Sequence, residues 1–80
     1  MDYKEIWTKT DEDLKSSLPA HAYEAWIETL SPIGITNDIF IVEAPNQFAY
    51  DWIINNYQDI ISSSLKEVDE KLQLKISIAP

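Results

Sequence analysis

Apolar side chains recur at helical spacing through the first part of the chain, which predicts an amphipathic helix over residues 2–18. Asp2 is placed to cap this helix, and its negative charge suits the positive end of the helix dipole. Pro19 ends the run, because proline disfavours the helical region for the residue before it. The apolar stripe is narrow and consists of Tyr3, Ile6, Trp7, Leu14 and Leu18.

A second helix is predicted over residues 19–30, since proline is accepted in a first helical turn. Pro32 and Gly34 stop this helix, and Gly34, the only glycine, is expected to serve a turn or a close approach. The core face of the helix is predicted to consist of Tyr23, Trp26, Ile27 and Leu30.

Two short strands are predicted at residues 33–36 and 39–44, and the turn residues Asn37 and Asp38 join them into a hairpin. Near the end of the chain, residues 72–78 alternate between apolar and polar side chains, which predicts a half-buried strand. Its apolar face consists of Leu72, Leu74, Ile76 and Ile78.

The third helix is predicted over residues 46–68, with Asn46 as its cap. The element order is then ααββαβ, an α+β fold in which three helices pack on a small three-stranded sheet. A chain of 80 residues makes one domain at most, so we expect a single domain over residues 1–80. The predicted core-facing side of the third helix consists of Ala49, Trp52, Ile53, Tyr57, Ile60, Ile61 and Val68.

Phe48 does not fit that core-facing side. On a helix that turns by about 100° per residue, Phe48 lies roughly 150° from the centre of the core face, and Trp52 lies about 100° from it on the same side as Phe48. Either Phe48 is exposed, where clustered aromatics mark interaction sites, or the helix begins later and Phe48 packs under the preceding loop. Periodicity alone leaves both interpretations open.

The remaining aromatic residues are assigned mainly to the core. Tyr23, Trp26 and Tyr57 lie on predicted core faces. Trp7 has two interpretations, because a narrow apolar stripe is also typical of a helix–helix contact between two copies. Packing in the core is favoured for Trp7, and a self-association seam is the alternative.

The composition is that of a globular protein with few cations. Hydrophobic residues make up 45% of the chain, and three Trp, four Tyr and two Phe give it an aromatic content that disordered chains lack. The net charge is −8, from 14 acids against six lysines, with no arginine. Because nucleic-acid binding depends on cation contacts to phosphate, this balance argues against autonomous binding of DNA or RNA. It favours solubility and a basic partner.

Little in the sequence supports catalysis or metal binding. There is no cysteine, which excludes disulfides and thiolate metal sites. His21, the Ser62–Ser64 run and the Asp11–Asp13 run are expected on solvated helix faces, and a single glycine provides no phosphate-binding loop. We therefore expect no enzyme activity, no cofactor and no metal. The charged N-terminus is not a signal peptide and no apolar run has the length of a membrane helix, so a cytoplasmic location without membrane contact is expected.

Several short motifs occur in an order that resembles a known family. They are the early Trp7, then Tyr23, Trp26 and Ile27 in "LPAHAYEAWI", then Ala44, Pro45, Asn46, Phe48, Asp51 and Trp52 in "APNQFAYDWI", and finally the alternating strand. Over essentially the whole chain, the sequence resembles the N-terminal domain (domain I) of the bacterial chromosomal replication initiator DnaA. The resemblance implies an ααββαβ fold similar to K-homology domains.

The resemblance also implies a protein–protein interaction domain that supports initiation of chromosomal replication. Such a domain self-associates, helps to recruit the replicative helicase and binds regulators of initiation. ATP binding and origin binding belong to other modules of the full initiator. Ala22 stands where some members carry an acidic residue that contributes to helicase contact, with Glu24 nearby. The implied self-association residues are Ile6 and Trp7, and the implied partner-binding residues are Ala22, Ala25, Trp26, Asn46, Phe48 and Trp52.

The alternative function is a weak single-stranded nucleic-acid-binding module of the K-homology type. Such modules hold the nucleic-acid backbone with a G-x-x-G loop, which a chain with one glycine does not have. Some members of the family bind single-stranded DNA weakly through this domain, but the charge of −8 argues against it here. The narrow stripe around Trp7 is compatible with a weak homodimer.

Overall fold

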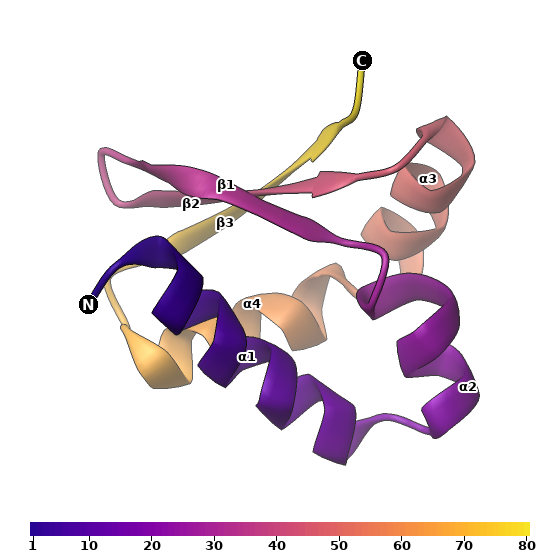
Figure 1. Cartoon of the computed structure of the whole chain (residues 1–80), viewed down its shortest axis with the longest axis horizontal. Helices are drawn as coiled ribbons and strands as arrows, with labels where there is room; N and C mark the ends of the chain where they lie inside the picture. Colours follow the sequence, from indigo (N-terminus) through magenta and orange to yellow (C-terminus); the bar gives the residue numbers. More distant parts are fainter.

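The computed structural model describes residues 1–80 and shows helices gathered on one side of a small sheet (Figure 1). The elements in chain order are α1 (Tyr3–Ser17), α2 (Ala20–Ala22), the π-helical turn η1 (Tyr23–Ile27), β1 (Ser31–Thr36), β2 (Ile39–Ala44), α3 (Gln47–Asn56), α4 (Gln58–Val68) and β3 (Gln73–Ile78). The α+β class and the order of helices and strands predicted from the sequence are therefore confirmed. No helix is both long enough and apolar enough to cross a bilayer.

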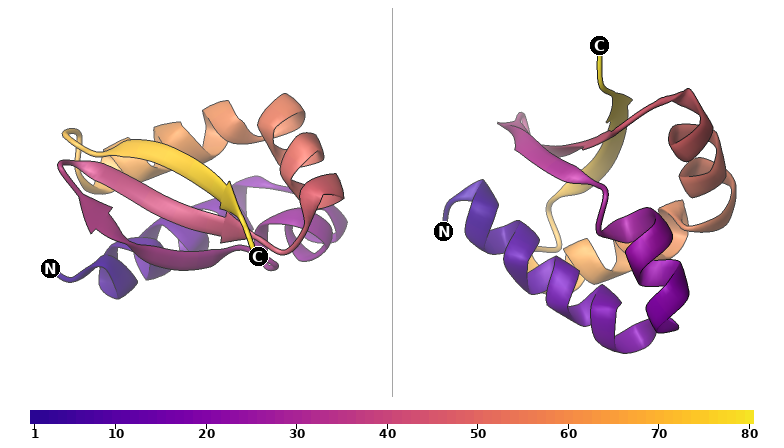
Figure 2. Two further views of the ribbon diagram at one scale, coloured as in Figure 1. Left: turned by 90° about the horizontal axis from the view of Figure 1, so that it is seen from above. Right: turned by 45° about the vertical axis from the view of Figure 1, so that its right-hand side comes forward.

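The sheet has the strand order β1-β2-β3, with β1 antiparallel and β3 parallel to the central β2. Figure 2, seen from above, shows the strands in front of the helices, so one face of the sheet is covered and the other is open. Phe40, Val42 and Ala44 of β2 are fully buried beneath it. They belong to a single core cluster that also contains Ile6, Trp7, Leu14, Tyr23, Ile27, Leu30, Ala49, Ile53, Ile61, Leu65, Leu72 and Ile76.

Both predicted helix caps are present. The Asp2 carboxylate accepts a hydrogen bond from the Glu5 backbone N–H at 3.0 Å, and the Asn46 side chain accepts one from the Ala49 N–H at 2.8 Å. Each cap satisfies a backbone donor that has no partner within its own helix. The cap at Asn46 makes Gln47 the first residue of α3.

The prediction of one continuous third helix was wrong. The chain leaves helical geometry at Tyr57, where φ is −126° and ψ is −7°, and it resumes as α4 in a new direction (Figure 1). Asn55 and Asn56 precede the break, and their side-chain amides donate to the carbonyls of Asp51 and Trp52 at 2.8 and 2.9 Å. Asparagine competes for backbone partners in this way, which weakens a helix end.

The role expected for Gly34 was also wrong. Gly34 lies within β1, has no positive φ, and a Cβ placed on it would meet no atom within 4 Å. Its position coincides with a shift in register between Pro32 and Gly34 against β2. The hairpin turn is instead made by Asn37 and Asp38, whose φ angles are 50° and 63°. Positive φ at both positions is what a tight hairpin turn requires, and Asn and Asp tolerate it.

The expectation of a solvated acidic face at Asp11–Asp13 was wrong for two of its three residues. Asp11 is partly buried and accepts a hydrogen bond from the Tyr23 hydroxyl, with 2.9 Å to each carboxylate oxygen. Asp13 accepts one from the Ser64 hydroxyl at 2.6 Å, and Ser64 is only 5% exposed, not on a solvated face. These bonds join α1 to η1 and to α4.

Candidate protein-docking surface

Three aromatic side chains from two separate elements meet at the surface beside η1 and α3. The Trp26 ring lies 5.3 Å from that of Trp52, with 22° between the planes, and 5.8 Å from that of Phe48, with 45° between the planes. We call Trp26, Phe48 and Trp52 the aromatic patch. Phe48 is 71% exposed and Trp52 is 45% exposed, which makes them the two exposed aromatics among the large apolar residues of the chain.

The cap at Asn46 explains the exposure of Phe48. Because α3 begins at Gln47, Phe48 already follows the periodicity of the helix, and the alternative of a later start was wrong. Ala49 and Ile53 point into the core with exposures of 6% and 0%. Phe48 and Trp52 are one turn apart, so they share the opposite, outward side. The exposed interpretation of Phe48 is the one that the structure bears out.

Two predictions that placed tryptophans in the core need correction. Trp52 was assigned to the core-facing side of its helix, but 45% of its surface is exposed. Trp26 was assigned to the core, but it is only half-buried and packs against the edge of the cluster. The π-helical turn explains why Trp26 is not on the predicted core face. Within this turn the Glu28 N–H donates to the Tyr23 carbonyl, five residues earlier, at 2.9 Å. The wider turn changes the directions of its side chains relative to an α-helix.

The other residues assigned to partner binding differ in their access to solvent. Ala25 is exposed next to Trp26, and Asn46 is exposed although its side chain is engaged in the cap. Ala22 is buried, with 6% of its surface exposed, and therefore offers a partner almost no contact area. The structure thus brings Ala25, Trp26, Phe48 and Trp52 to the surface, and it leaves their roles as predictions.

The residues assigned to self-association lie in the core. Ile6 is 5% exposed and Trp7 is 7% exposed, and the Trp7 ring stacks on Phe40 at 6.1 Å. The favoured interpretation of Trp7 as a core residue is therefore confirmed. Thr10, which interrupts the stripe in the sequence, is fully buried, and its hydroxyl is satisfied because it donates to the Ile6 carbonyl at 2.9 Å.

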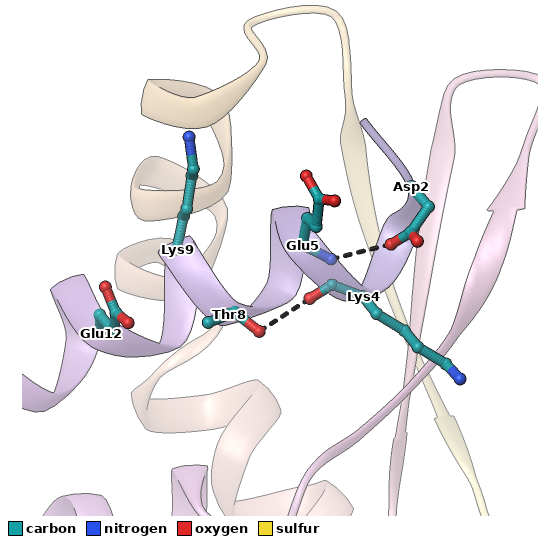
Figure 3. Close-up of a pocket in the computed structure, with 6 residues that line it drawn as sticks. All are labelled: Asp2, Lys4, Glu5, Thr8, Lys9 and Glu12. Atoms are coloured by element: carbon teal, nitrogen blue, oxygen red, sulfur yellow. Dashed lines mark hydrogen bonds between the residues drawn. The ribbon is translucent and has the colours of Figure 1, made fainter.

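Two hollows occur on the surface, and neither includes the aromatic patch. One, of about 360 Å³, lies along α1, and Figure 3 shows its side chains spread along the helix without converging on a point. It is lined only by Asp2, Lys4, Glu5, Thr8, Lys9 and Glu12. The other, of about 390 Å³, lies between the end of α1 and η1 and is lined by Lys15, Leu18, Ala20, Tyr23, Glu24 and Glu28. The aromatic patch is therefore a surface outside both hollows.

Tyr23 has the one clearly perturbed ionisation in the molecule. Burial raises the pKa of its phenol to about 12, and the hydrogen bond to Asp11, the charge of Asp11 and the charge of Glu28 act in the same direction. A phenol that stays protonated up to such a pH is a structural hydrogen-bond donor rather than a base. Lys15 also lies over the Tyr23 ring, 5.8 Å from its centroid.

No arrangement typical of an enzyme surrounds the polar groups. His21 is exposed on α2, as expected, and no group of three or more His, Cys, Asp or Glu side chains is placed to hold a metal ion. Sequence reasoning missed Asp13 and Ser64 as partners, because they are 51 residues apart and no local pattern connects them. It also missed the contacts of Trp26 with Phe48 and Trp52 of α3. The only signal for these contacts in the sequence is that all three side chains are aromatic.

Comparison with known proteins agrees with this geometry. The family model described as the DnaA N-terminal domain matches residues 4–67. A crystal structure of a HobA–DnaA (domain I–II) complex from Helicobacter pylori contains a chain with a similar fold, with a TM-score of 0.72 and 22% sequence identity. The similarity covers 91% of this chain and 98% of that one. Since the matched residues extend from α1 to α4 and include the whole aromatic patch, the chain belongs to the DnaA N-terminal domain family.

Proposed function

We propose that this domain is a docking module in the initiation of chromosomal replication and that its aromatic patch is the contact surface. Membership of the DnaA N-terminal domain family supports a role in replication initiation through protein–protein contacts. The observation that carries the choice of surface is the exposure of Phe48, an aromatic side chain that leaves 71% of its area accessible to water. Interface hot spots are rich in such aromatic anchors.

The partners that we propose are the replicative helicase and regulators of initiation. The structural relative from Helicobacter pylori occurs in a complex with HobA, which supports a regulator as one kind of partner. The Trp26 indole stacks on that of Trp52 beside Phe48, so a hydrophobic pocket on a partner that receives Phe48 is expected to contact the indoles as well. The setting for these contacts is the cytoplasm.

Weak self-association through α1 is a further part of the proposal. Ile6 and Trp7 offer 5% and 7% of their surface, so a second copy reaches them only at their edges. Met1, which is 70% exposed, and the half-buried Tyr3 lie next to them in the sequence and supply the remaining apolar area. A seam with so little area predicts a weak dimer, since stable interfaces bury about 800 Å² on each partner.

The test is the affinity of the purified replicative helicase for the domain and for two matched variants. Phe48→Ala removes the protruding ring, and we expect it to weaken binding by about 30-fold, the effect of a hot-spot residue worth about 2 kcal/mol. Ile39→Ala is the control, because Ile39 is 37% exposed and is the first residue of β2, the end of the strand that follows the hairpin and not the end that leads to α3 (Figure 1). It should change the affinity by less than about twofold. Equal effects of both variants, or none for Phe48→Ala, would count against the patch.

A further inference from the structure

The negative charge of the chain is distributed unevenly. Residues 16–65 contain six acids and no lysine or arginine, whereas the other 30 residues contain eight acids and six lysines. The first stretch therefore carries −6 of the net charge of −8. Its acids are Glu24, Glu28, Asp38, Glu43, Asp51 and Asp59.

All three residues of the aromatic patch lie within this cation-free stretch. They belong to η1 and α3, which occupy one end of the molecule, while the lysines belong to α1, the last turn of α4 and the segment through β3 (Figure 1). On the elements that carry the patch, Glu24 in η1, Glu28 directly after it and Asp51 in α3 are exposed carboxylates, and Lys15 of α1 lies against Tyr23 of η1. Charge complementarity steers a partner of opposite sign and repels one of the same sign.

Asp51 places one of these charges directly beside the patch. It precedes Trp52 and lies one helical turn after Phe48, and it is exposed. Its Oδ1 accepts a hydrogen bond from the Gln47 side chain at 2.7 Å, which holds the carboxylate in place, while Oδ2 accepts none within the chain. Asp51 is about 60° around the helix from Phe48 and about 100° from Trp52, so a cation that pairs with this oxygen lies at the edge of the patch. Indole faces attract arginine and lysine side chains.

We infer that the segment that docks on the aromatic patch is positively charged, with an apolar anchor flanked by arginine or lysine. The anchor packs against Phe48 and Trp26, and the neighbouring cation stacks on Trp52 and pairs with Asp51. This inference rests on the proposed function and specifies the chemistry of the partner. The carboxylates of Glu24, Glu28 and Asp51 disfavour an acidic segment or a phosphate backbone at this surface.

The test is an NMR titration with two probe peptides of equal length. Both carry the same two leucines, and one has arginines at the positions where the other has glutamates. The indole N–H signals of Trp26 and Trp52 report on the patch, and Trp7, which is 7% exposed in the core, is an internal reference. We expect the arginine peptide to shift Trp26 and Trp52 but not Trp7, and to bind at least about tenfold more tightly than the glutamate peptide. A single-stranded oligonucleotide should shift neither patch signal.

Two variants of equal charge locate the effect. Asp51→Asn neutralises the carboxylate beside the patch. It should lower the affinity for the arginine peptide by about two- to fivefold, as expected for the loss of an exposed ion pair. Asp38→Asn changes the net charge equally but lies in the hairpin turn at the other end of the sheet, where asparagine accepts the positive φ (Figure 1). It should leave the affinity unchanged.

Three results overturn the inference. They are equal binding of the two peptides, no shift of Trp26 and Trp52 with either peptide at millimolar concentration, and equal weakening by the two variants. If the peptides bind equally while Phe48→Ala still weakens helicase binding as expected, the docking function stands and only the charge of the partner is wrong. If Phe48→Ala leaves helicase binding intact, the proposed function itself fails.

Discussion

At the scale of single residues, the two phenylalanines of the chain have opposite environments. Phe40 is fully buried in the central strand, and Phe48 is 71% exposed at the start of α3. Removing a buried ring costs transfer free energy and leaves a cavity, whereas removing an exposed ring costs neither. Comparison of the two residues therefore distinguishes a side chain that stabilises the fold, Phe40, from one that is available for binding, Phe48.

Chemical unfolding of two alanine variants measures this difference. Phe40→Ala should lower the free energy of unfolding by about 3–5 kcal/mol. Phe48→Ala should change it by less than about 0.5 kcal/mol, because no core contact is lost. A loss of several kcal/mol in Phe48→Ala would show that the ring packs in the fold, which contradicts its assignment to the docking surface.

Tyr23 makes the stability of the domain depend on pH in the alkaline range. Its pKa is raised from 10.0 to about 12 in the folded state, mainly by burial and then by Asp11 and Glu28. The folded state holds the phenol proton more tightly than the unfolded state does, so this contribution is complete below pH 10 and is lost as the pH rises towards 12. Acidification does not affect it.

Thermal unfolding at pH 8 and pH 11 of the wild type and of Tyr23→Phe isolates the contribution. The melting temperature of the wild type should fall further between the two pH values than that of the variant, because the variant has no phenol at this position. Tyr3, Tyr50 and Tyr57 are present in both proteins and cancel in the comparison. An identical fall in melting temperature in the two proteins would mean that the pKa of Tyr23 is not raised in the folded state.

At the scale of elements, patterns that are local in sequence predicted the structure well. The first helix was expected at 2–18 and spans Tyr3–Ser17, and the last strand was expected at 72–78 and spans Gln73–Ile78. The strand Ile39–Ala44 has the expected bounds, and its partner begins two residues earlier than expected, at Ser31. Apolar periodicity, caps and turn residues act over a few residues, so the sequence displays them directly.

The features that were missed depend on contacts between distant residues. No proline or glycine marks the helix break at Tyr57. Because of this break, α4 takes a new direction and packs against α1. The bond between Asp13 and Ser64 joins residues from these same two helices. Trp26 left the predicted core face because η1 takes a wider turn, and no local propensity signals that change.

The candidate site was predictable to a similar extent. Helical periodicity placed Phe48 outside the core face but left its exposure open, and the cap at Asn46 decides it. The stacking of Trp26 on Trp52 joins η1 to α3, so it requires the tertiary fold. Core packing of Trp7 was favoured from its place on the apolar stripe, whereas the burial of Ala22 was not predicted.

At the scale of the whole molecule, the domain separates its structural and its interacting parts. One face of the sheet and the inner sides of the helices form the single core, and hydroxyl–carboxylate bonds from α1 hold η1 and α4 against it. The aromatic patch lies on η1 and α3, two elements that contain no lysine. A partner can therefore be gained or exchanged at this surface without disturbing the core.

Hydroxyl-radical footprinting of the domain, alone and with the replicative helicase, tests the central claim most directly. Oxidation of each side chain reports its access to solvent, and Phe48 and Trp52 start from exposures of 71% and 45%. The account predicts that the helicase protects these two side chains, while Met1, which is 70% exposed and precedes the first turn of α1, remains as reactive as before. Protection of Met1 with unchanged oxidation of Phe48 and Trp52 would place the contact on α1 and contradict the account.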